Sequence, residues 1–91
     1  MDVAIDASSI ANDDAAAGPK YGVLTDEKRA AIRLAAHLEG VLLDPVYTAT
    51  GLAGLIRLAR AGRIAASDTV VFVHTGGLPA LFAYGGEVLG A

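Results

Sequence analysis

Two short segments of this chain carry the residue types that could do chemistry. The first is DPVYT at residues 44–48, and the second is HTGG at residues 74–77. A phenol can hydrogen-bond a substrate carboxylate or move a proton, and small residues allow backbone amides to approach a ligand closely. Each segment follows an apolar run, as ligand-binding segments do at the carboxyl ends of parallel strands. The pattern predicts one ligand site built from both segments.

The elements that would position these segments are a β-strand, a helix and a second β-strand. Residues 41–43 and 69–73 are apolar runs that predict short buried strands. Between them, apolar residues at helical spacing predict a helix that begins near 48–51 and ends at Ala61, before Gly62. A parallel strand–helix–strand unit of this kind is right-handed. We therefore expect an α/β fold that contains one βαβ unit.

Two further helices are expected. Thr25 is a good N-cap and is followed by two acids, while Gly40 is a natural helix end, so a helix should lie between them. A short helix should begin at the glycines of HTGG and cover residues 79–84. The buried face of the first helix should consist of the apolar residues at helical spacing, namely Ala31, Ile32, Leu34, Ala35 and Leu38.

The length of 91 residues allows one small domain. Residues 1–17 predict a loop or an edge strand around Val3 and Ile5, residues 18–84 contain all the motifs, and residues 85–91 form a tail. The composition is 54% hydrophobic with a mean hydropathy of +0.50. Parallel strands this apolar are covered on both faces, and the predicted helices are too few to do so. The chain is therefore expected to be part of a larger domain or to associate, for example as a homo-oligomer.

Composition also excludes several classes of function. The net charge is −3 with scattered lysines and arginines, which provides no basic patch for nucleic acid. There are no cysteines, and no spacing of histidines and acids predicts a metal site. The apolar segment 69–86 contains Pro79 and four glycines, which favours a strand and a turn over a membrane span. Since no signal peptide is recognisable, a cytoplasmic protein is expected.

The two segments, together with GPKYG at residues 18–22, resemble pyridoxal-phosphate-dependent enzymes of fold type II, the tryptophan-synthase-β-like group. The branch they resemble is that of D-cysteine desulfhydrase and 1-aminocyclopropane-1-carboxylate deaminase. The resemblance covers residues 18–84, most of the chain. It implies a parallel-sheet fold, pyridoxal phosphate as the cofactor of the complete enzyme, and a place in the C-terminal portion of that enzyme.

The resemblance implies a role for each candidate residue. Tyr47 would lie against the cofactor ring or over the substrate, and Tyr21, 26 positions earlier, would lie near the substrate. Thr48 would offer its hydroxyl to the pyridine nitrogen. The residues alone leave open that the tyrosines only pack or lie on the surface and that Thr48 is a helix cap. The far side of the cofactor pocket would be lined by Thr75, Gly76 and Gly77.

The residue at the pyridine nitrogen bears on the reaction. A neutral hydroxyl there suffices for α-proton removal and β-elimination, whereas the ring-opening deaminases carry an acid at the position of Thr48. This difference favours a D-cysteine desulfhydrase-like lyase, which gives a keto acid and ammonia, over the ring-opening reaction. The chain departs from the family at Ala49-Thr50, where the family has Gly-Lys, and this departure leaves the substrate open.

The resemblance provides no counterpart for the lysine that binds the cofactor covalently. Lys20 and Lys28 are the only lysines, and neither stands at the position of the family lysine. The chain alone is therefore expected neither to bind pyridoxal phosphate nor to be active, and to need the missing N-terminal portion or a lysine-bearing partner. Two alternatives remain, a non-catalytic oligomeric interaction fragment and an unrelated small ligand-binding domain.

Overall fold

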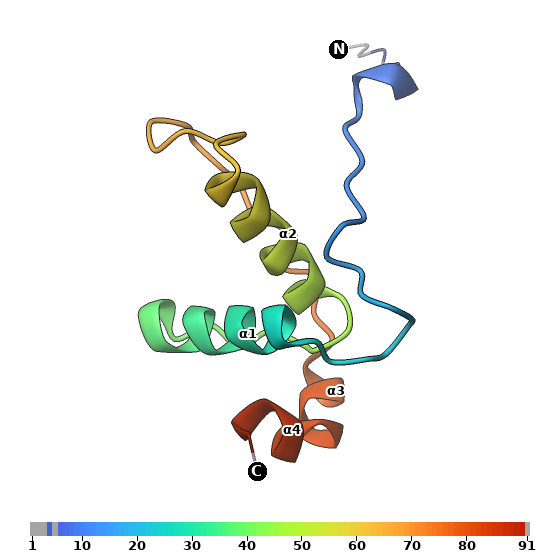
Figure 1. Cartoon of the computed structure of the whole chain (residues 1–91), viewed down its shortest axis with the longest axis vertical. Helices are drawn as coiled ribbons and strands as arrows, with labels where there is room; N and C mark the ends of the chain where they lie inside the picture. The colour runs from blue at the N-terminus through green and yellow to red at the C-terminus, as the bar shows by residue number, and fades with distance from the viewer. Residues whose placement is uncertain (1–3, 5, 91) are drawn as a thin grey trace.

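The computed structural model describes Ala4 and residues 6–90. A short 3-10 helix, η1 (Ala7–Ser9), precedes the longer helices α1 (Asp26–Glu39) and α2 (Thr48–Arg60), and two short helices follow, α3 (Leu78–Ala83) and α4 (Gly85–Leu89). The helices α1 and α2 pack against each other, and α4 contacts both α1 and α3. In Figure 1 the N-terminal segment leads away from the helices, while α3 and α4 lie on the side of α1 opposite α2.

The prediction of an α/β fold with a parallel βαβ unit is wrong for the part of the chain that the structure describes. None of these residues lies in a β-strand. Residues 41–43 and 69–73 are irregular, and no backbone–backbone hydrogen bond joins the two segments. They are linked through a side chain instead, because His74 Nε2 lies 2.7 Å from the carbonyl oxygen of Leu42. The predicted edge strand around Val3 and Ile5 lies outside the described residues.

The failed strand prediction has a physical reason. β-branched residues favour strands because they fit a pleated, half-buried surface, so composition alone does not provide the pairing partner. The side chains of Val71 and Val73 are 83% and 72% exposed. A two-stranded pair is marginal in water without a covering surface. The segment 69–73 therefore remains irregular and leaves its apolar side chains uncovered.

The prediction for the first long helix is confirmed at both ends. Thr25 Oγ1 accepts a hydrogen bond from the backbone amide of Lys28 at 3.2 Å, as an N-cap should. Gly40 adopts φ 65° in the left-handed region and ends α1. The buried face is rotated from the predicted one, because Lys28, Ala31 and Ile32 are buried whereas Leu34 and Leu38 are exposed.

The second long helix also matches the prediction, since α2 begins at Thr48 and ends one residue before Ala61. Small residues at the crossing allow α1 and α2 to approach closely, and Ala16, Ala31 and Ala53 form one buried cluster there. A second cluster consists of Ile32, Leu43, Ala49 and Val88. Among the described residues no helix is long and apolar enough to cross a bilayer.

The C-terminal helices attach to the rest through side-chain hydrogen bonds as well as through Val88. Arg29 Nε donates to the carbonyl oxygen of Glu87 at 2.7 Å. The hydroxyl of Tyr84 donates to the carbonyl oxygen of Gly22, also at 2.7 Å. The short helix predicted after the HTGG segment is confirmed as α3, whereas the segment expected to be a tail contains α4. The first bond joins α4 to α1, and the second joins Tyr84 to Gly22, the last residue of the GPKYG turn.

Candidate functional site

The site is organised around Asp44, a carboxylate with 1% of its surface exposed. Its Oδ2 accepts hydrogen bonds from the backbone amides of Val46 and Tyr47 at 2.9 and 2.7 Å. Its Oδ1 accepts from the backbone amide and the hydroxyl of Thr48 at 2.8 and 2.6 Å. Four donors thus converge on one carboxylate. They hold the segment DPVYT in one conformation at the N-terminus of α2.

These hydrogen bonds decide the ionisation of Asp44. Burial alone would raise the pKa of its carboxyl group, but the bonds from the Thr48 hydroxyl and from three backbone amides outweigh burial and lower that pKa below its ordinary value. A carboxylate here also interacts favourably with the positive end of the α2 dipole. The N-terminal amides of α2 therefore already hold an anion that belongs to the chain.

Thr48 is buried, with 3% of its surface exposed. Its hydroxyl donates to Asp44 Oδ1 and accepts the backbone amide hydrogen of Asp44, at 2.6 and 2.8 Å. Because a hydroxyl has one hydrogen and two lone pairs, one lone pair of Thr48 Oγ1 remains for a further partner. The role of Thr48 at the pyridine nitrogen stays a prediction. In the structure this hydroxyl holds residues 44–48 in place through its two hydrogen bonds with Asp44.

The two predicted tyrosines come together. The hydroxyl oxygens of Tyr21 and Tyr47 lie 2.7 Å apart, and their rings meet edge to face with centroids 6.2 Å apart. Both side chains are exposed, so their hydroxyls are accessible to a ligand. The hydrogen bond with Tyr47 raises the pKa of the Tyr21 phenol above its ordinary value, and the nearby Tyr84 and Asp44 act in the same direction.

A pocket of about 320 Å³ opens beside this tyrosine pair. Both lysines of the chain line it, but they differ in environment. Lys20 is exposed, whereas Lys28 is 2% exposed and donates through Nζ to the carbonyl oxygens of Ala17 and Val23. The pocket thus combines two phenols with the exposed cationic side chain of Lys20, which suits a small molecule with a carboxylate, whereas the Lys28 ammonium is already bonded to the chain.

The turn of the second segment packs directly on Asp44. Gly77 has φ 89°, and a Cβ atom placed on it would lie 2.7 Å from Asp44 Cγ. Only glycine fits such a position without displacement. The turn is fixed further by His74, whose Nδ1 accepts the backbone amide of Gly76 at 3.1 Å while Nε2 contacts Leu42. Thr75 is exposed at the surface of this turn.

The structure thus joins part of the predicted set and not all of it. It brings Tyr21 to Tyr47, and it brings Thr48 and Gly77 to the same carboxylate. The sequence interpretation missed Asp44 and the buried Lys28 as organising residues. The signal for Asp44 was its spacing, because an aspartate four residues before a threonine at a helix start can accept the free amides of that helix. No comparable sequence signal marks Lys28.

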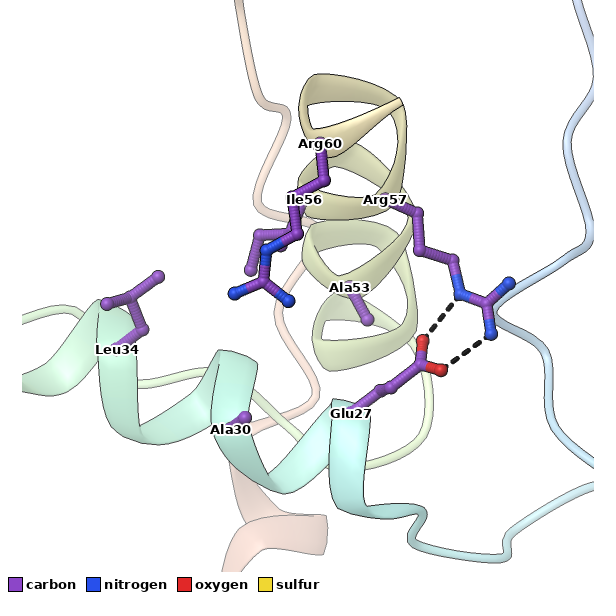
Figure 2. Close-up of a pocket in the computed structure, with 7 residues that line it drawn as sticks. All are labelled: Glu27, Ala30, Leu34, Ala53, Ile56, Arg57 and Arg60. Atoms are coloured by element: carbon purple, nitrogen blue, oxygen red, sulfur yellow. Dashed lines mark hydrogen bonds and ion pairs between the residues drawn. The ribbon is translucent and has the colours of Figure 1, made fainter. Parts of the chain in front are cut away.

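A separate pocket of about 300 Å³ lies between α1 and α2 (Figure 2). Arg57 makes a bidentate ion pair there with Glu27, at 2.5 and 2.6 Å. The ion pair lowers the pKa of Glu27 and raises that of Arg57. Figure 2 shows the Arg57 side chain directed toward Glu27 and that of Arg60 directed over the pocket. None of the predicted site residues lines this pocket, which is therefore separate from the site around Asp44.

The comparison with known families agrees with the resemblance to pyridoxal-phosphate-dependent enzymes. Residues 2–76 match the family described as pyridoxal-phosphate dependent enzyme. The matched region contains both long helices, the tyrosine pair, Asp44 and Thr48, and it ends within the HTGG turn. The match spans most of the 91 residues. The chain therefore belongs to the pyridoxal-phosphate-dependent enzyme family.

Proposed function

We propose that this chain forms one wall of the active site of a pyridoxal-phosphate-dependent lyase or deaminase. The observation that carries the proposal is the pair of tyrosine hydroxyls, 2.7 Å apart, beside a pocket that two lysines also line. Among the possible branches, a D-cysteine desulfhydrase-like activity is favoured, because Thr48 provides a neutral hydroxyl where a ring-opening deaminase would carry an acid. The expected products from D-cysteine are hydrogen sulfide, a keto acid and ammonia, formed in the cytoplasm.

The donor groups of the site fit one side of the cofactor. Tyr47 presents an aromatic ring, which suits the pyridine ring. The hydroxyl hydrogen of Thr48 is donated to Asp44 Oδ1 in this structure, so Thr48 would have to turn this hydrogen toward the pyridine nitrogen to bind it, because two acceptors do not hydrogen-bond each other. The backbone amides at the start of α2 already donate hydrogen bonds to Asp44. Those of Tyr47 and Thr48 donate to its carboxylate, and that of Ala49 donates to its carbonyl oxygen at 3.0 Å. The phosphate group would therefore be held by other residues. When bound, pyridoxal phosphate withdraws electrons from the substrate carbon that loses its proton.

The tyrosine pair provides the proton chemistry of this proposal. Two phenols have two hydroxyl hydrogens, and the mutual hydrogen bond uses one of them. The other remains available to hydrogen-bond a substrate carboxylate or to protonate the departing hydrosulfide to hydrogen sulfide, after which the phenol recovers its proton from water. Tyr21 and Tyr47 are thus the proposed catalytic residues, while Thr75, Gly76 and Gly77 are proposed to line the cofactor pocket.

The covalent link to the cofactor is proposed to come from a lysine outside this chain. Lys28 is buried and bonded to two carbonyl oxygens, and Lys20 is exposed on the turn next to Tyr21. A visible absorption spectrum of the chain mixed with pyridoxal phosphate tests this point. We expect no defined binding site. A stoichiometric absorption band that disappears in Lys20→Ala or in Lys28→Ala would contradict the proposal.

Activity is tested by co-expressing the chain with the lysine-bearing N-terminal portion of a D-cysteine desulfhydrase-type enzyme. The reconstituted protein should release keto acid from D-cysteine faster than from 1-aminocyclopropane-1-carboxylate. Tyr47→Phe should lower turnover of D-cysteine by about tenfold to a hundredfold, because it removes one hydrogen-bonding proton donor and keeps the ring. Preferred ring opening, or full activity of both Tyr47→Phe and Tyr21→Phe, would refute the assignment.

A second candidate function rests on the exposed apolar segment 70–73. Val71 and Val73 are largely exposed, and apolar side chains that are exposed close together are typical of an interaction site. The chain could therefore act as a non-catalytic, oligomeric interaction module. Sedimentation of the chain without cofactor distinguishes the candidates. Stable homo-oligomers that do not dissociate when the N-terminal portion is added would favour the interaction module, whereas a one-to-one complex with that portion would favour the enzyme.

A further inference from the structure

Lys28 is an unusual residue in this structure, because its long cationic side chain is only 2% exposed. Its Nζ donates hydrogen bonds to the carbonyl oxygens of Ala17 and Val23, at 2.9 and 3.2 Å. These carbonyls lie on opposite sides of the turn that carries Tyr21. Lys28 therefore connects the two ends of this turn to the first turn of α1.

The environment of the ammonium group makes this connection specific. A buried ammonium is unfavourable unless hydrogen bonds replace its water, so Lys28 stays buried only while both carbonyls remain in place. The turn also packs closely on Lys28, because a Cβ atom on Gly18 would lie 3.6 Å from Nζ and 3.1 Å from Thr25 Cγ2. On the far side of Tyr21, the hydroxyl of Tyr84 donates to the carbonyl oxygen of Gly22.

We propose that Lys28 is the positioning residue of the tyrosine pair: its ammonium group holds the turn in the conformation that brings the Tyr21 hydroxyl to hydrogen-bonding distance of Tyr47. Tyr21 is 78% exposed, so few contacts of its own side chain restrain it. The restraint comes from the backbone of its turn. The importance of Lys28 for catalysis rests on the proposed function of the pair, whereas its positioning role does not.

The acidity of Tyr21 reports this role directly. The hydrogen bond with Tyr47 raises the pKa of the Tyr21 phenol. Loss of positioning should therefore lower that pKa toward the ordinary value of about 10. Removal of a nearby positive charge by itself has the opposite effect, because it disfavours the phenolate and raises the pKa. The direction of the change thus separates positioning from simple electrostatics.

The experiment uses the 91-residue chain with tyrosine labelled at Cζ, so that NMR follows each phenol through a pH titration. Lys28→Met keeps the length of the side chain and removes its donors, and the Tyr21 midpoint should fall. Lys28→Arg, which keeps the charge and the donors, should restore a raised midpoint. Lys20→Met is the matched control, because it removes a lysine of the same pocket that makes no such bonds to the turn, and it should not lower the midpoint.

Two further measurements make the result decisive. In the Tyr47→Phe background, Lys28→Met should produce no additional fall, because the bond that it positions is already absent. Far-UV circular dichroism checks that α1 and α2 remain folded. If Lys28→Met loses this helical signal, Lys28→Leu replaces it, since leucine also removes the donors while it is a good helix former, and the Tyr21 midpoint should again fall. An unchanged or raised midpoint in the folded variant would overturn the proposal.

The activity of the reconstituted enzyme separates this inference from the proposed function. If Lys28 positions the pair and the pair is catalytic, Lys28→Met should lower D-cysteine turnover as much as Tyr21→Phe does. A lowered Tyr21 midpoint without any loss of turnover would support the positioning role and refute the catalytic one. A loss of turnover with an unchanged midpoint would instead refute positioning by Lys28 and leave the proposed function standing.

Discussion

The hydroxyl group of Thr48 should be a major source of stability in this chain, and Thr48→Val tests it. Valine keeps the shape of threonine but removes the donor to Asp44 Oδ1 and the acceptor of the Asp44 amide. A hydrogen bond to a charged group contributes roughly 1.5–3 kcal/mol, and a buried amide left without an acceptor costs about 1–3 kcal/mol. The free energy of unfolding should therefore fall by roughly 2.5–6 kcal/mol.

Thr48→Ser is the matched control, because it keeps the hydroxyl and removes one buried methyl group. Its expected cost is about 1 kcal/mol. Urea unfolding followed by circular dichroism measures both variants, and thermal unfolding gives a second comparison. A difference of this size is a large part of the total stability of a small domain, which is roughly 0.05–0.15 kcal/mol per residue.

Thr48→Val must be much less stable than Thr48→Ser, because only valine removes both hydrogen bonds. Equal stability of the two variants, or a valine variant as stable as the original chain, would show that the network around Asp44 contributes little. Hydrogen exchange of the amides of residues 46–48 gives an independent check, since these amides should lose protection first.

Three other outcomes follow from the same structure. Hydrogen bonds lower the pKa of Asp44 in the folded chain. The stability that they contribute is therefore present above the unfolded pKa of about 4 and is lost as the pH falls through the folded pKa. Because Thr48→Val raises that folded pKa, the variant should flatten the acid part of a stability–pH curve. Gly77→Ala should destabilise the chain by ~1–3 kcal/mol in urea, because alanine is strained at positive φ and meets Asp44. Glu27→Gln should change the thermal midpoint little, since water and salt screen its half-exposed ion pair with Arg57, and a fall as large as that of Thr48→Val would contradict this.

The helices could be predicted because their signals are local. Thr25 and Gly40 mark the ends of α1 through capping groups that act within a few residues, and helical spacing marks α2. The buried face of α1 was predicted less well, because which side is covered depends on where α2 crosses. Leu34 and Leu38 fit the apolar stripe and are nevertheless exposed, whereas Lys28 is buried.

The strands and the centre of the site could not be predicted from local pattern. Strand formation in residues 69–73 requires a pairing partner, which no local signal provides, and the described residues contain no such pairing. The tyrosine pair was anticipated only through the family resemblance, which placed both residues near one substrate. The role of Asp44 depends on a side chain that folds back on the backbone after it, and that of Lys28 depends on carbonyls 5 and 11 positions away.

The bond from Tyr84 to Gly22 has a consequence for the order in which the molecule folds. Its two residues are 62 positions apart, whereas the tyrosine pair spans 26 and the Lys28 bonds span 11 or fewer. The entropy lost on closing a loop rises with its length, so we expect the contacts of Lys28 to form before the Tyr84 bond. During synthesis, Lys28 can therefore hold the turn around Tyr21 before the C-terminal helices are made. The bond from Tyr84 then adds a second restraint on the same turn.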